Sequence, residues 1–175
     1  MNNSTASKTT AFWTTFVGVF LLDFATKRWA ERNLLPLYTP YQVIGDTVRL
    51  TLAYNKDAAM GLSLGEYSRI GFTLVAAVVL VVLGIFYRRI PRTGRRPAIT
   101  LGLVAAGALG NLTDRVMFSH RVVDFIDLGI GSTRFWTFNV ADAAITFGAI
   151  LLAIISMTEQ REREVPAAST TQAKS

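Results

Sequence analysis

Long uncharged apolar runs alternate with shorter polar segments along this chain. A helix rises about 1.5 Å per residue, so about 20 apolar residues cover the hydrocarbon core of a membrane, which is about 30 Å thick. Four runs reach this length, and they predict spans over residues 11–30, 67–87, 98–117 and 139–157. We therefore expect a mainly α membrane protein with four transmembrane helices.

The segment between the first two spans, residues 33–66, has a different pattern. Prolines and glycines separate short β-prone pieces, of which residues 47–54 are the longest, and this is typical of strands joined by turns. The segment is too long for a tight turn and too polar to cross a membrane. We predict a small extracytoplasmic β-rich platform that lies on the bilayer.

Three further segments complete the predicted organisation. Residues 118–138 form an outer loop in which residues 122–127 are predicted to be extended. The polar residues 1–10 and 158–175 are predicted to be disordered tails. The first span follows its tail without a small-residue cleavage site, so we interpret it as a permanent signal anchor.

Basic residues predict the orientation in the membrane. The net charge is +6, and five arginines lie between the second and third spans: Arg88, Arg89, Arg92, Arg95 and Arg96. Lysine and arginine concentrate in cytoplasmic loops, so this loop and both termini are predicted to be cytoplasmic, with the platform outside. A lipid-headgroup or nucleic-acid patch is the alternative, but the charges cluster in linkers, and we expect no nucleic-acid partner.

With this orientation, polar residues from several segments fall at the outer end of the spans. Placing ionisable residues at a membrane boundary costs free energy, so such residues indicate a functional role more than a structural one. The candidate site residues are Asp23, Lys27, Asn55, Asn111, Asp114, Arg115, Asp124, Asn139 and Asp142.

Composition narrows the chemistry of this site. The chain has no cysteine and a single histidine, His120, which excludes disulfides, thiolate catalysis, cysteine-ligated metals and a histidine-rich metal site. We expect His120 to lie at the membrane interface rather than to catalyse, and Asp127 to be a solvated loop charge. Carboxylates remain as the candidate catalysts.

Helical spacing predicts some local partners. Asp23 and Lys27 are four residues apart and can pair on one helix face. Asn111, Asp114 and Arg115 also share a face, so Arg115 either holds Asp114 ionised or clamps a neighbouring loop. A structural ion pair that closes the helix end is the alternative for Asp114.

Two other aspartates lack a cation nearby in the sequence. Asn139 is a plausible N-cap that places Asp142 in the first turn of the last span. If Asp124 and Asp142 face each other, they share a proton, and one can deprotonate water while the other protonates or hydrogen-bonds a carbonyl. Such a pair needs no metal, thiol or serine. Residue chemistry alone leaves Asp114 as a rival of Asp124.

Five ordered motifs resemble the lipoprotein signal peptidases, also called signal peptidase II, over roughly residues 12–157. They are Asp23-Phe-Ala-Thr-Lys27, Asn55-x-x-Ala-Ala, Gly110-Asn-Leu-Thr-Asp-Arg115, Val122-Val-Asp-Phe125 and Phe138-Asn-Val-Ala-Asp142. The resemblance implies a bacterial inner-membrane aspartyl endopeptidase that cuts a prolipoprotein just before its diacylglyceryl-modified cysteine. It matches Asp124 and Asp142 to the catalytic pair and the other candidates to positions that line or brace the site.

The resemblance also implies the partners. We expect diacylglyceryl-modified prolipoprotein signal peptides and membrane lipids as partners, inhibition by globomycin-type cyclic peptides, no metal or other cofactor, a monomer, and an active site near the outer leaflet. The chain has Asp57 where the family usually has glycine, and Phe24 where it usually has glutamine. Asp57 is expected to affect the backbone geometry of the platform loop. Phe24 is expected to change only a packing contact.

Two other functions are weighed against this one. A different intramembrane protease is disfavoured because the chain lacks a Gly-x-Gly-Asp motif. A proton-coupled transporter or lipid-binding protein would also use membrane carboxylates, but no paired, broken repeat of the transporter kind occurs here.

Overall fold

The computed structural model describes residues 7–55, 68–118 and 121–169, with residues 68–69 and 161–169 described by their backbone alone. Several predictions concern residues outside these ranges. They are the outermost parts of both tails, the stretch after Asn55 that contains Asp57, and His120.

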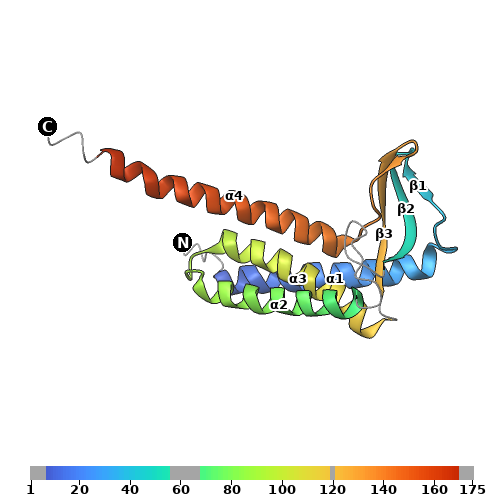
Figure 1. Ribbon diagram of the computed structural model, residues 1–175, viewed down its shortest axis with the longest axis horizontal. Coiled ribbons are helices and arrows are strands. Elements are labelled where there is room, and N and C mark those ends of the chain that lie inside the picture. Colours follow the sequence, from blue (N-terminus) through green and yellow to red (C-terminus); the bar gives the residue numbers. More distant parts are fainter. Residues whose placement is uncertain (1–6, 56–67, 119–120, 170–175) are drawn as a thin grey trace, which may run out of the picture.

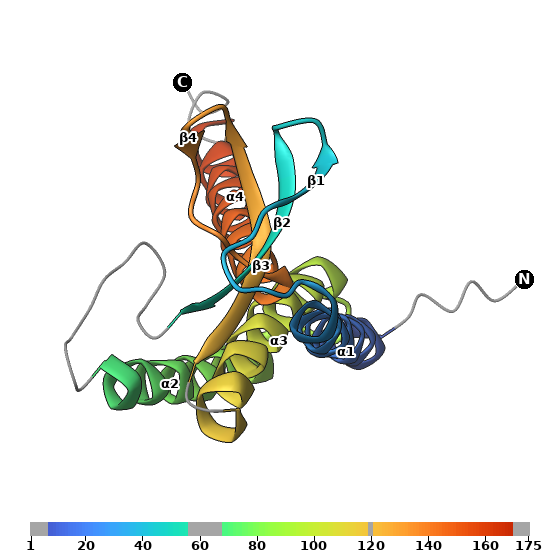
Figure 2. The same cartoon turned by 90° about the vertical axis from the view of Figure 1, so that its right-hand side faces the viewer.

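Four helices form a bundle with a small sheet at one end (Figure 1). α1 (Lys8–Asn33) and α3 (Arg95–Met117) run toward the sheet, whereas α2 (Ser68–Arg89) and α4 (Val140–Ser169) run away from it. α1 therefore begins, and α4 ends, at the end of the bundle away from the sheet. α3 is the central helix and packs against the other three (Figure 2).

Among the described helices, three are long and apolar enough to cross a membrane: Lys8–Asn33, Ile70–Arg89 and Val140–Gln160. α3, which covers the predicted span 98–117, is not one of them. The central position of α3 explains why it need not be as apolar as a helix that faces lipid. Its surface faces other helices and is rich in small residues that allow close packing. The mainly helical fold is confirmed, whereas the fourth span stays a prediction.

The sheet is antiparallel with the strand order β1 (Tyr41–Ile44), β2 (Val48–Asn55), β3 (Val122–Ile130) and β4 (Thr133–Arg134). The two predicted extended pieces are confirmed as β2 and β3. The sequence assigned them to separate outer segments, yet they are hydrogen-bonded neighbours, with Ala53 opposite Asp124.

An apolar cluster attaches the sheet to the bundle. Ala30 and Leu34, at the end of α1, pack with Leu52 of β2 and with Val123 and Phe125 of β3. Burial of such side chains is the main favourable term in folding. The cluster therefore fixes β2 and β3 against the end of α1.

The ends of two helices differ from the predicted span limits. α1 begins at Lys8, where the side chain of Ser7 accepts a hydrogen bond from the backbone N–H of Thr10. α4 continues to Ser169, so residues 158–169 are helical where a disordered tail was predicted. Glutamate, glutamine and arginine, which make up residues 159–164, have high intrinsic helix propensities.

Candidate active site

A cavity of about 690 Å³ lies where the sheet meets the bundle. Five of the predicted site residues line it: Asn55, Asn111, Arg115, Asp124 and Asp142. The other four are buried and do not line it: Asp23, Lys27, Asp114 and Asn139. The predicted residues thus form two neighbouring groups, one open to the cavity and one sealed inside the protein.

Asp124 and Asp142, called here the aspartate pair, come from β3 and α4 and are joined by Asn139. The side-chain amide of Asn139 donates to Asp124 Oδ1 at 2.7 Å. Its Oδ1 accepts from the backbone N–H of Asp142 at 2.9 Å, and Asp142 Oδ2 accepts in return from the backbone N–H of Asn139 at 3.3 Å. This reciprocal arrangement is a capping box, and it confirms Asn139 as the N-cap.

The backbone explains how Asn139 reaches Asp124. The segment before α4 lies along β3, where the carbonyl of Phe138 accepts from the backbone N–H groups of Phe125 and Ile126 at 3.0 and 2.8 Å. Phe138 N–H donates back to Ile126 O at 3.0 Å. Residue 139 must then follow beside residue 124, and α4 starts there.

Asp142 is also held from α3. The side-chain amide of Asn111 donates to Asp142 Oδ1 at 2.7 Å. Both oxygens of Asp142 therefore accept hydrogen bonds, one from a side-chain amide and one from the backbone. α3 and the start of α4 together orient this carboxylate at the cavity wall.

Asp124 is 3% exposed, and its burial raises the pKa of its carboxyl to about 7. The negative charge of Asp142 is the second contribution to this raised value, because two neighbouring carboxylates resist ionising together. Hydrogen bonds from Asn139 and Asn55 and the positive charge of Lys27 lower it by less. Asp124 can therefore carry a proton near neutral pH.

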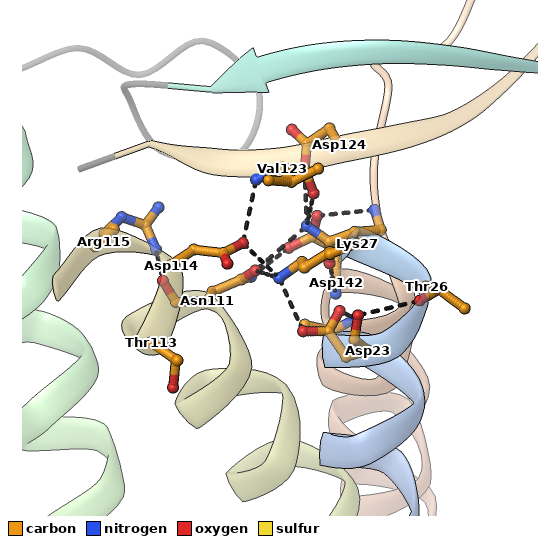
Figure 3. A network of polar contacts seen from close by, with 12 residues as sticks. Asp23, Thr26, Lys27, Asn111, Thr113, Asp114, Arg115, Val123, Asp124 and Asp142 are labelled. Atoms are coloured by element: carbon orange, nitrogen blue, oxygen red, sulfur yellow. Dashed lines mark hydrogen bonds and ion pairs between the residues drawn. The ribbon is translucent and has the colours of Figure 1, made fainter. Parts of the chain in front are cut away.

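Lys27 gathers Asp23, Asp114 and the cavity-lining Asn111 around its ammonium group, and these four residues are called here the Lys27 cluster (Figure 3). Lys27 Nζ lies 2.8 Å from Asp23 Oδ2 and 3.1 Å from Asp114 Oδ2, and it donates to Asn111 Oδ1 at 2.9 Å. The predicted Asp23–Lys27 pair is confirmed. Asn111 belongs to both groups, since its amide nitrogen reaches Asp142.

Asp114 was expected to interact with Arg115, but the ion pairs found for it go to α1. Asp114 Oδ1 lies 2.9 Å from Arg28, and its other oxygen faces Lys27. Arg115 instead lines the cavity, donates to the backbone carbonyl of Asn111 at 3.3 Å and interacts electrostatically with the aspartate pair. Arg115 thus contributes charge to the cavity, whereas Asp114 faces the protein interior.

Residues 15–158 match the protein family described as Signal peptidase (SPase) II. The chain belongs to this family. It is 36% identical to the lipoprotein signal peptidase of Hydrogenovibrio crunogenus over 172 residues, which cover 97% of this chain and 98% of the relative. It is 41% identical to the lipoprotein signal peptidase of Pseudomonas putida over 151 residues, covering 85% and 86% of the two chains.

Solved structures agree with this assignment. A bacterial membrane enzyme determined by the in meso method at 2.3 Å superposes with a TM-score of 0.76 and 29% identity, covering 87% of this chain and 90% of the other. A second, at 1.9 Å, gives a TM-score of 0.72 and 30% identity, covering 82% and 90%. This signal peptidase II chain is therefore a protease, and its apolar helices agree with a membrane protein.

Sequence reasoning missed Arg28, which links three elements of this signal peptidase II chain. Besides Asp114, Arg28 pairs with Glu31 at 2.9 Å and lies 4.0 Å from the ring centroid of Phe118. Glu31 in turn accepts from the hydroxyl of Tyr54 on β2 at 3.1 Å. Its position next to Lys27 was the available signal, but the partners outside α1 follow only from the packing of the sheet on the bundle.

The prediction for Asp127 was wrong. This residue is buried on β3 rather than solvated in a loop, and it pairs with Arg134 at 2.8 Å. The turn at Gly131, which has a positive φ of 58°, folds β4 back along β3 and brings Arg134 to Asp127. The hydroxyl of Thr51 on β2 donates to the same carboxylate at 3.2 Å.

Proposed function

We propose that this chain is a membrane aspartyl endopeptidase that removes the signal peptide from prolipoproteins by cutting before the diacylglyceryl-modified cysteine. The observation that carries the proposal is that Asp124 and Asp142 line one cavity and are tied together through Asn139. The names of the relatives, lipoprotein signal peptidase, support the substrate class.

In the proposed mechanism, the protonated Asp124 donates to the scissile carbonyl oxygen while Asp142 takes a proton from water. The resulting hydroxide attacks the carbonyl carbon and forms a tetrahedral diol. Asp142 then gives its proton to the amide nitrogen as the C–N bond breaks, and Asp124 recovers a proton from the diol. Both carboxyls return to their starting states, with one peptide bond and one water consumed.

The side-chain amides support this division of roles. Asn139 and Asn111 hold the pair through neutral hydrogen bonds, so they orient the carboxyls without fixing a charge on them. The raised pKa of Asp124 suits the acid, and Asp142 is the base. Arg115, at the cavity wall, can stabilise the partial negative charge on the carbonyl oxygen while the proton of Asp124 is being transferred to it.

The cavity rim suits a lipidated substrate. Phe135 and Trp136 line the cavity, and each is 56% exposed. Aromatic side chains favour the membrane interface, so this rim would anchor the protein in lipid and contact the acyl chains of the modified cysteine. The same cavity would bind globomycin-type cyclic peptides as inhibitors.

The proposed topology has four spans, with both termini in the cytoplasm and the cavity near the outer leaflet of the bacterial inner membrane. The ends of the bundle support this orientation, because α1 begins and α4 ends away from the sheet. Arg88 and Arg89 end α2, and Arg95 starts α3, at that same end. Because one chain contributes both aspartates, the proposed active form is a monomer surrounded by lipid.

Mass spectrometry of a diacylglyceryl-modified precursor incubated with the purified protein tests the proposal. We expect one new product that begins at the modified cysteine, and no cleavage of the same precursor without its lipid. Equal cleavage of unlipidated membrane spans would favour a different intramembrane protease. Proton-coupled flux in liposomes without cleavage would favour a transporter.

A further inference from the structure

Two buried carboxylates accept hydrogen bonds from backbone groups next to the aspartate pair. Asp114 Oδ2 accepts from the N–H of Val123 at 3.2 Å, and Val123 directly precedes Asp124. Asp23 Oδ1 accepts from the N–H of Ala141 at 2.8 Å, and this residue directly precedes Asp142. Each member of the pair therefore follows a backbone group that is anchored to a different helix.

Lys27 connects the two anchors. Its ammonium group contacts Asp23 and Asp114 at 2.8 and 3.1 Å and donates to Asn111 at 2.9 Å (Figure 3). Lys27 therefore joins the two anchors by ion pairs and α3 by a hydrogen bond. The side chain is 1% exposed and does not line the cavity, so it does not reach a substrate there.

We propose that Lys27 is a positioning residue that fixes the separation of Asp124 and Asp142 by tying together the two carboxylates that anchor their backbones. The inference rests on the proposed catalytic role of the pair. The backbone bonds of Phe138 and the side chain of Asn139 already join β3 to the start of α4, and the anchors on α1 and α3 add a second link on the side of the helices. Catalysis is sensitive to such placement, and a shift of about 1 Å can lower a rate about 100-fold.

A simpler role must be distinguished from positioning. Buried carboxylates without a cation are strongly destabilising, so Lys27 could act only by balancing the charges of Asp23 and Asp114. The triple variant Asp23→Asn, Lys27→Met, Asp114→Asn separates the two roles. It removes the three charges together, and both amide oxygens can still accept from Val123 and Ala141, but nothing joins the two anchors.

If Lys27 positions the pair, the triple variant folds but its kcat falls about 100-fold while KM stays within about threefold, because none of the three substituted residues lines the cavity. Hydrogen exchange at the amides of Val123 and Ala141 becomes faster. Lys8→Met is the matched control. Lys8 also joins helices, donating to the carbonyl of Tyr87 at 3.1 Å, but at the end of the bundle away from the sheet, so kcat stays unchanged.

Two results would overturn the inference. A triple variant with the kcat of the natural chain would leave charge balance as the only role of Lys27. A triple variant that does not fold would make Lys27 a folding residue. The failure of the proposed function is a separate outcome: the natural chain would not cleave the lipidated precursor, whereas amide exchange at Val123 and Ala141 would still test the link without a substrate.

Discussion

The Lys27 cluster and the aspartate pair are two groups of carboxylates in contact, and they are held in different ways. In the cluster, Asp23 and Asp114 form ion pairs with Lys27, and Asp114 also pairs with Arg28. In the pair, the hydrogen bonds found within the described part of the chain come from neutral amides of asparagine side chains and of the backbone, and Arg115 adds a positive charge from the cavity wall. One group is sealed, and the other opens to a cavity.

This difference distinguishes carboxylates with a structural role from carboxylates suited to catalysis. A carboxylate beside a cation keeps its charge and is useful as an anchor, whereas one held by amides next to a like charge can change its protonation state. Burial, and after it the negative charge of Asp142, raise the pKa of Asp124 to about 7. The comparison favours Asp124 over its rival Asp114 as the catalytic group, and the following predictions test it.

The largest effect is expected from neutralising either member of the aspartate pair. Asp124→Asn and Asp142→Asn should each lower the cleavage rate at least about 1,000-fold, because an amide cannot exchange a proton with water or the carbonyl. Cleavage of the lipidated precursor measures the rate, and the thermal unfolding midpoint checks the fold. Substantial cleavage by either variant would remove that residue from the pair.

A smaller effect is expected from changing the residue that joins the pair. Asn139→Asp keeps a side-chain oxygen to cap α4 but replaces the donor to Asp124 with a third carboxyl. We expect about a 100-fold lower kcat with little loss of stability, because N-caps of Asn and Asp are nearly equivalent. Asn139→Ala, which also loses the cap, provides the comparison and should unfold at a lower temperature.

The pH profile should then report Asp124. Its pKa is raised from the ordinary 3.8 to about 7, so a mechanism that needs its proton predicts that kcat/KM falls about tenfold per pH unit above pH 7. The free energy of unfolding should also decrease as the pH rises. The contribution of Asp124 to it is fully present below pH 4 and is lost as the pH rises through 7. A flat profile up to pH 9 would contradict the role of Asp124 as the acid.

A milder effect is expected when the charge of the rival residue is removed. Asp114→Asn keeps an acceptor for the N–H of Val123, so we expect kcat to fall no more than about tenfold. Asp114→Ala loses both the ion pairs and the acceptor, and breaking a buried ion pair costs about 3 kcal/mol of unfolding free energy. If Asp114→Asn were as inactive as Asp124→Asn, the division between the two groups would be wrong.

The smallest effect is expected at the edge of the sheet. Asp127→Asn weakens the ion pair with Arg134, and a partly exposed pair contributes about 1 kcal/mol at most. Because Asp127 lies outside the cavity wall, kcat should stay within about twofold. Thermal unfolding and the cleavage assay together measure this, and a large loss of kcat would show that the sheet edge is coupled to the pair.

Features that depend on neighbouring residues could be predicted from the sequence. Apolar runs predicted the four helices, and the predicted limits differ from the observed ones by a few residues except at the end of α4. The β-prone residues 47–54 and the segment 122–127, which was predicted to be extended, correspond to β2 and β3. The Asp23–Lys27 pair and the N-cap at Asn139 follow from spacings of four and three residues. Helix periodicity fixes such contacts before any tertiary packing is known.

The contacts that distinguish the two groups depend on packing instead. The bond from Ala141 to Asp23 joins residues 118 apart, and the bond from Lys27 to Asn111 joins residues 84 apart. Arg28 and Asp114 meet because α1 lies against α3, and Asp124 is buried because β3 pairs with β2 over the bundle. The sequence by itself determined which polar residues stand near the ends of the helices. Only the tertiary structure decided which carboxylates face cations and which face amides, because partner choice and burial arise when distant segments pack together.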